Sequence, residues 1–328
     1  MTWRAARVPV LVSLLSGAGC DAPPSEPRPR GDVTAPWRMP LRPFCEGSYT
    51  SLPAVRGRLE GNALVEVSGV VASPTNPDVL WMHNDSGDDA RLFAVAVSGA
   101  LLGELRLGSV EARDLEDLAA APCPDASGPC LWVADTGDNE QLRDDAIVYA
   151  VAEPAVSVSV SVGTLTPDAL WRFPVEYPGG PVDVEAIVAL PDGSGFFLFE
   201  KIDADAARVF RSPAPLVDDL PLLLEEVGRI PSPGVAIAHG RKITGADLHP
   251  SGRALVVRVY TGVFEYSLAN VDDLLRLDEI EPFTVTLGPL TEPQGEAVAY
   301  DEIGLGLWTV SEDPEGNGGQ PLHHYACE

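Results

Sequence analysis

Two acidic turns whose residue types could do chemistry stand fifty positions apart in the chain. The first, Asp85-Ser86-Gly87-Asp88, follows the apolar run LWMHN, and the second, Asp135-Thr136-Gly137-Asp138, follows LWVA. Two aspartates that a fold brings together can share one proton, and such a pair can activate water. The alternative is that Asp85 and Asp135 are copies of one repeated unit.

Asp-Ser-Gly and Asp-Thr-Gly are also the paired motifs of pepsin-like aspartic proteases. Those enzymes carry one motif in each of two lobes, far apart in the sequence. The short distance between the two turns here instead indicates neighbouring copies of a small unit. We therefore set the protease interpretation aside and look for a repeat.

A unit of four short β-strands occurs five times along the chain. The first strands of the units read VEVSGVV (65–71), DLEDLAA (114–120), DVEAIVA (183–189), ITGADLH (243–249) and QGEAVAY (294–300). Each is followed by an apolar second strand and a third strand, and each is preceded by a candidate fourth strand. The runs are rich in β-branched and aromatic residues and are bounded by Gly, Pro and Asp. Such units repeated about a centre form a β-propeller.

The predicted fold is therefore all-β: one five-bladed β-propeller over residues 45–328. Six blades are the alternative if the segments 153–167 or 230–242 hide further strands. The last unit supplies only three strands, so its fourth strand, near 54–60, comes from the other end of the chain. One blade is thus composite. A helical turn or two is expected only at VDDLLRL (271–277).

The cysteines support this closure. Four follow Cys20, and an even set in an exported chain implies disulfides. Cys123 and Cys130 flank a turn, PDASGP, and so form a local pair. By elimination Cys45 pairs with Cys327, which joins the two ends of the predicted propeller.

The first 44 residues lie before the repeat and carry targeting signals. Residues 1–20 combine arginines, a short apolar run and small residues before Cys20, which is typical of an export signal with a lipobox-like end. Simple cleavage nearby is the alternative to lipidation of Cys20. Residues 21–44 are Pro-rich and read as a tether. We expect an exported protein, lipid-anchored to the bacterial cell envelope at the periplasm or the cell surface.

The formal net charge of −27 restricts the partners. It argues against nucleic acid and anionic membrane surfaces, so contact with a membrane is expected only through the lipid anchor at Cys20. It suits divalent cations and a monomer with a solvated surface. Only two of the 22 basic residues are lysines, Lys201 and Lys242.

The first strands of a propeller line its central channel, so equivalent positions face one another. The aligned strands place these residues at one level: Ser68, Glu116, Glu185, Ala246 and Glu296. Carboxylates gathered in a narrow channel must be neutralised, protonated or bound to a metal, and oxygen ligands favour Ca²⁺. Ser68, Glu116, Glu185 and Glu296 are the predicted Ca²⁺ ligands; bonds to backbone amides are the alternative.

This set resembles the ligands of the calcium-activated nucleotidases, the secreted apyrases. The resemblance implies a five-bladed propeller with one serine or glutamate ligand per blade. The fifth position, a serine in that family, is Ala246 in this alignment, with Asp247 adjacent. The strings HNDSGD, DLEDLA, DTGDN and TGAD also resemble uncharacterised exported bacterial propellers that are grouped with phytase-like esterases.

The ends of the second strands are expected to gather on one rim of the channel. The candidate ligand-binding residues there are His83, Asp85, Asp135, Asp138, Glu200, Lys201, Arg258 and Tyr260. Lys201 and Arg258 could hold an anionic group beside Ca²⁺, or could form salt bridges with neighbouring acids. His83 could be a general base or a hydrogen-bonding strut, and the acidic turns could bind a peripheral Ca²⁺ or cap themselves.

Two classes of function fit these residues. The first is a Ca²⁺-centred propeller that binds an anionic small molecule or a surface protein. The second is a Ca²⁺-dependent hydrolase of phosphorylated small molecules, similar to a nucleotidase or a phytase. The fold alone does not choose between them, and the scarcity of basic residues favours binding.

Overall fold

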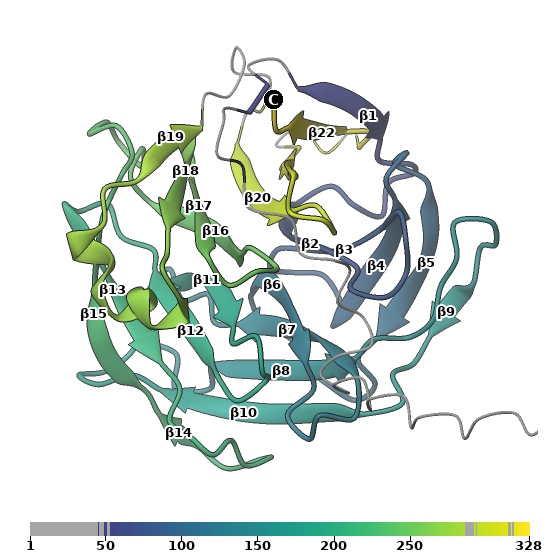
Figure 1. The fold of residues 1–328 in the computed structure, drawn as a ribbon. Helices are drawn as coiled ribbons and strands as arrows, with labels where there is room; N and C mark the ends of the chain where they lie inside the picture. Colours follow the sequence, from purple (N-terminus) through teal and green to yellow (C-terminus); the bar gives the residue numbers. More distant parts are fainter. Residues whose placement is uncertain are drawn as a thin grey trace, which may run out of the picture. The chain divides into compact units, whose positions relative to one another are not determined.

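Five small β-sheets form a ring, with their inner strands facing its centre (Figure 1). The structure, a computed structural model, describes residues 45, 49–50, 53–285, 292, 294–313, 316 and 318–328. The predicted export signal (1–20), the tether (21–44) and Cys20 lie outside the described residues. The five-bladed β-propeller predicted from the repeat is confirmed.

Blades 1 to 3 are built from consecutive strands, with the inner strand first. Blade 1 comprises β2 (Val67–Ala72), β3 (Val79–Asn84), β4 (Arg91–Ala96) and β5 (Leu101–Arg106). Blade 2 comprises β6 (Leu115–Pro122), β7 (Pro129–Asp135), β8 (Ile147–Ala152) and β10 (Leu170–Glu176). Blade 3 comprises β11 (Val184–Ala189), β12 (Phe196–Glu200), β13 (Ala206–Arg211) and β15 (Glu225–Pro231).

Blades 4 and 5 complete the ring. Blade 4 comprises β16 (Ile243–Leu248), β17 (Ala254–Val259), β18 (Gly262–Ser267) and β19 (Phe283–Val285). Blade 5 comprises β20 (Gly295–Tyr300), β21 (Gly306–Ser311), β22 (Pro321–Ala326) and β1 (Ala54–Arg58). The predicted helical turn is a 3₁₀ segment, η1 (Val271–Glu279). Within the described part of the chain, no helix is both long and apolar enough to cross a membrane.

The segments 153–167 and 230–242, which could have supplied strands of a sixth blade, do not form a separate sheet. Residues 163–165 form β9 (Gly163–Leu165), which pairs in parallel with β5. The segment 230–242 contains the end of β15 and a loop that leads to β16. A further short strand, β14 (Leu222–Leu223), extends blade 2. The described residues therefore form five sheets.

The hydrophobic core lies between neighbouring blades. The tryptophan of each Leu-Trp run, Trp81 in blade 1 and Trp132 in blade 2, is fully buried. Trp132 stacks on Phe173 of its own blade, with ring centroids 5.9 Å apart, and contacts Phe196 of blade 3 at 6.1 Å. Inner strands such as β11 are buried along their whole length, including the carboxylate of Glu185.

A β-bulge occurs at the same point of all five inner strands, and it corrects the sequence alignment. In each ladder with the second strand one residue is skipped, and the skipped residues are Ser68, Glu116, Glu185, Thr244 and Glu296. The fifth equivalent position is therefore Thr244 and not Ala246. Ala246 pairs with Val257 further along the strand and packs in the core. The alignment by sequence had shifted this strand by two residues relative to the other four.

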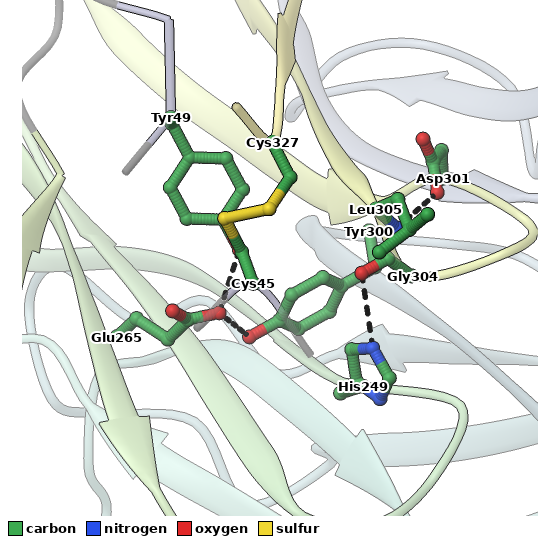
Figure 2. Close-up of a disulfide and its surroundings, with 9 residues drawn as sticks. All are labelled: Cys45, Tyr49, His249, Glu265, Tyr300, Asp301, Gly304, Leu305 and Cys327. Atoms are coloured by element: carbon green, nitrogen blue, oxygen red, sulfur yellow. Dashed lines mark hydrogen bonds between the residues drawn. A yellow bond between two sulfur atoms is a disulfide. The ribbon is translucent and has the colours of Figure 1, made fainter. Parts of the chain in front are cut away.

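Blade 5 closes the ring with strands from both ends of the chain, as predicted. β1 pairs antiparallel with β22, with Ala54 opposite His324. Both predicted disulfides, Cys45–Cys327 and Cys123–Cys130, are present. Beside Cys45–Cys327, the hydroxyls of Tyr49 and Tyr300 both donate to Glu265 Oε1, at 2.7 and 2.6 Å (Figure 2). These bonds join the N-terminal segment to blades 4 and 5.

Candidate functional site

One mouth of the channel is formed where the inner strands begin and the second strands end. Two sets of equivalent positions lie there. The first set is the bulge residues. The second set lies two residues earlier, directly before the first residue of each inner strand: Glu66, Asp114, Asp183, Lys242 and Gln294. The carbonyls of four of the second set accept bonds from backbone N–H groups that follow the second strands, those of Asp85, Gly137, Lys201 and Glu312. The same register in successive blades brings these side chains to one mouth.

Five carboxylates from three adjacent blades converge at this mouth. Asp85, Asp114 and Glu116 form one triad, and Glu116, Asp183 and Glu185 form another. In each triad one oxygen from every residue lies within 4.8 Å of the others. Glu116 belongs to both, so the two triads are one continuous acidic cluster, which we call the mouth cluster.

Burial and mutual repulsion raise the pKa values in the mouth cluster. Glu116 is only 3% exposed, and burial, followed by the charges of Asp85 and Asp114, raises its pKa well above the usual range. Burial and the neighbouring Asp85 raise the pKa of Asp114 to about 7. Burial also raises the pKa of Asp183. A group of acids held in this way gains from a bound cation.

Lys201 supplies a positive charge to one side of the mouth cluster. Its ammonium forms an ion pair with Glu185, and its side chain is only 9% exposed. It also lies over the ring of Tyr260, 5.9 Å from the centroid. The described residues give Asp85, Asp114 and Glu116 no ion pair with a lysine or an arginine. The positive charge is therefore unevenly distributed between the two triads.

Glu296 lies at the mouth but in neither triad. Its Oε1 accepts a bond from Gln294 Nε2 at 3.1 Å, and the Tyr260 hydroxyl is a further hydrogen-bond partner. Its Oε2 is buried, and the part of the chain that the structure describes gives this atom no hydrogen bond of good geometry. Burial raises the pKa of Glu296 to about 7, and burial with the charge of Glu296 raises that of Glu312 to about 8. The structure thus separates Glu296 from Glu116 and Glu185, with which the sequence grouped it.

Gly137 makes room for the mouth cluster. A Cβ atom at this position would collide with Glu116 Oε1 and with the carboxylate of Asp114. Next to it, a surface pocket of about 320 Å³ is lined by Asp114, Gly137, Arg113 and Arg143 among others. This pocket opens beside the triad that lacks an ion-paired cation.

Asp117 crosses the channel below the mouth. This side chain is fully buried, and its Oδ2 accepts backbone N–H bonds from Ile187 of blade 3 at 3.0 Å and Ala246 of blade 4 at 3.1 Å. Its Oδ1 accepts the N–H of Leu118 at 2.8 Å. Asp117 therefore ties three inner strands together beneath the mouth cluster.

Several predicted site residues serve the fold. Ser68 Oγ donates to the Glu116 carbonyl at 2.8 Å, which is the predicted backbone alternative to metal ligation. Asp135 pairs with Arg143 at 2.9 Å, and Asp138 accepts the backbone N–H groups of Leu142 and Arg143. These two aspartates of the second acidic turn hold its loop in place.

The remaining rim residues form salt bridges or are buried. Glu200 pairs with Arg208 at 2.7 Å, and Arg258 pairs with Glu292, so the salt-bridge alternative holds for Arg258 as it does for Lys201. His83 is fully buried: Nδ1 contacts the Asn84 carbonyl at 2.8 Å, and the ring packs where Gly69 leaves space. These contacts fit the predicted structural role of His83 and not the role of a general base.

Sequence reasoning missed Asp114, Asp183 and Gly137. A signal for the two aspartates was present, because blades 2 and 3 both open with Asp-x-Glu. In a strand, residues two apart share a face, so both acids of each string face the channel. Gly137 had no comparable signal, since its role depends on the carboxylates that pack against it.

Comparisons with known proteins give little further information. No protein-family model matches the chain, and no curated protein matches it. Among solved structures, a chain of the "Crystal Structure of Mitotic Checkpoint Complex" is similar over 79% of this chain, with 10% identity and a TM-score of 0.37. The chain spans 63% of the length of that chain.

Proposed function

We propose that the protein is an exported binding propeller whose mouth cluster binds Ca²⁺ and, beside it, an anionic small molecule or an anionic group of a surface protein. The observation that carries this proposal is the convergence of five carboxylates from three blades in two triads that share Glu116. The two disulfides support an oxidising compartment, in agreement with the export signal and lipid anchor predicted at Cys20.

The residues present fit a calcium ion. All the side-chain donors of the mouth cluster are oxygens, which Ca²⁺ prefers and which disfavour softer metals. Gly137 keeps side-chain atoms away from Glu116 and Asp114. The bound ion would supply positive charge to the triad of Asp85, Asp114 and Glu116, which has no ion-paired cation among the described residues.

The neighbouring pocket supports an anionic ligand. Arg113 lies in its lining with a side chain 58% exposed and pairs with the half-exposed Asp145 at 2.6 Å, an ion pair that an anionic ligand would have to replace. Asp114 belongs to both the pocket and the mouth cluster, and the acids Asp138, Glu140 and Asp144 also line the pocket, so an anion would bind there only beside a bound cation. An anion in this pocket would be attracted by Arg113 and by a cation held at Asp114. The ligand class is therefore small and acidic, such as a phosphate or a carboxylate.

Two observations favour binding over hydrolysis. His83, the candidate general base, is buried below the rim and bonded to a carbonyl. Asp117, the acid next to Glu116, is bonded to backbone N–H groups of blades 2, 3 and 4, so it is not a free carboxylate that could act as a base. Hydrolysis of nucleotides or phytate in the presence of Ca²⁺ would favour the alternative, a calcium-dependent phosphohydrolase.

Calcium titration of chelator-treated protein tests the proposal. Calorimetry should detect binding, and Ca²⁺ at a hundredfold excess over Kd should stabilise the fold by about 2.7 kcal/mol. Glu116→Gln should abolish most of this response, because it removes the carboxylate that both triads share. The matched control is Glu60→Gln, an exposed residue outside the mouth. A wild-type protein that neither binds Ca²⁺ nor changes its Tm would refute the proposal.

A further inference from the structure

The Lys201 ammonium occupies a carboxylate of the mouth cluster that a metal would need as a ligand. Its ammonium pairs with Glu185, and the side chain is almost completely buried among acids. Its charge also acts on Glu116, Asp183 and Glu296, which lie on different sides of the mouth. Lys201 therefore neutralises part of the cluster from within the chain.

A calcium ion needs the same oxygens. Ca²⁺ takes six to eight oxygen ligands, and Glu185 can offer its carboxylate to the metal only after the ammonium has left. Two positive centres within a few ångströms of each other also repel strongly in a buried site. The triad of Asp85, Asp114 and Glu116 alone offers a metal fewer protein ligands than the whole cluster does.

The geometry points to Lys201 as an intramolecular competitor, which holds Glu185 until a divalent cation displaces it. This inference rests on the proposed calcium site and adds a regulatory element to it. Tyr260 offers the displaced ammonium a second position, since its ring already lies 5.9 Å from Nζ. Cation binding at the mouth would thus be coupled to movement of the Lys201 side chain towards Tyr260.

The two lysines of the chain provide a matched pair of variants. Lys201→Gln and Lys242→Gln remove the same charge at the same mouth, but the described contacts of Lys242 include no ion pair. We expect calorimetry to give Lys201→Gln a Ca²⁺ affinity on the order of tenfold higher than wild type, because like-charge repulsion is removed. Lys242→Gln should change the affinity by less than Lys201→Gln does, because the charge of Lys242 acts on Asp183 but forms no ion pair among the described residues.

Lys201→Arg keeps the charge and should remain close to wild type. Thermal unfolding separates this effect from a general loss of stability. In the presence of chelator, Lys201→Gln should have a lower Tm than wild type. Ca²⁺ should then raise the Tm of Lys201→Gln by more than it raises the Tm of wild type. If wild type binds Ca²⁺ and Lys201→Gln binds it equally or more weakly, the competition is refuted and the calcium site stands. If neither protein binds Ca²⁺ in calorimetry, both the site and the competition are refuted.

Discussion

Arg258 is a single residue at the rim whose partners decide its role. Its guanidinium is 2% exposed, pairs with Glu292 and donates to the Ala297 carbonyl at 3.2 Å. Glu292 also accepts from Thr309 Oγ1 at 2.6 Å and contacts His323 Nδ1 at 2.7 Å. Arg258 therefore neutralises a buried acid and is not available to hold a ligand.

The free energy of unfolding at acid pH should depend on the ionisation of Glu292. Burial alone would raise the pKa of Glu292, but Arg258 and the hydrogen bonds lower it from 4.5 to about 2. A lowered folded-state pKa contributes stability above the unfolded value and loses it as the pH falls through the folded one. Glu292→Gln should therefore cost on the order of 3 kcal/mol at pH 7.

That difference between wild type and Glu292→Gln should shrink as the pH falls from about 4.5 to about 2, because Glu292 then becomes protonated in the folded protein as well. Urea unfolding at a series of pH values measures it, with Glu60→Gln as the exposed control. A cost that stays constant over this range would mean that the charge of Glu292 does not stabilise the fold.

At the scale of elements, the bulged inner strands are joined by hydroxyl groups. Ser68 Oγ donates to the Glu116 carbonyl, and Thr244 Oγ1 donates to the Gly295 carbonyl at 3.1 Å. Ser68→Ala and Thr244→Val should each lower the free energy of unfolding by about 1 kcal/mol, and the two effects should add because the sites are in different blades. Neither change should weaken Ca²⁺ binding; a loss of affinity in Ser68→Ala alone would restore Ser68 as a metal ligand.

The elements were predictable from the sequence to a greater extent than the site was. Alternation and turn residues locate the strands, and counting strands in the last unit predicts the composite blade. Ala246 was aligned where Thr244 lies because a shift of two residues keeps the same face of a strand, so the alternating pattern does not reveal it. Glu116 and Glu185 were found because they recur at one level of the repeat. The pairing of Arg258 with Glu292 depends on contacts between blades, which a repeat does not encode.

At the scale of the whole molecule, stability depends on closing the ring. Blade 5 combines β1 with β20 to β22, and Cys45–Cys327 links residues separated by 282 positions. In the chain-entropy model a loop of this length stabilises by about 5 kcal/mol, whereas the seven-residue separation of Cys123–Cys130 corresponds to about 2 kcal/mol. Closing the ring is thus the larger of the two covalent contributions.

A circular permutant should remove this dependence on the disulfide. The Cα atoms of Cys45 and Cys327 are 5.5 Å apart, so a short glycine linker can join the two ends. New termini between the exposed Gly179 and Gly180 would make the four main strands of every blade consecutive in the chain. In the natural order, replacing Cys45 and Cys327 by alanine should cost about 5 kcal/mol. In the permutant the linker already closes the loop, so chemical denaturation should show a much smaller cost. An equal cost in both proteins would mean that the disulfide stabilises through local packing near Tyr49 and not through closure.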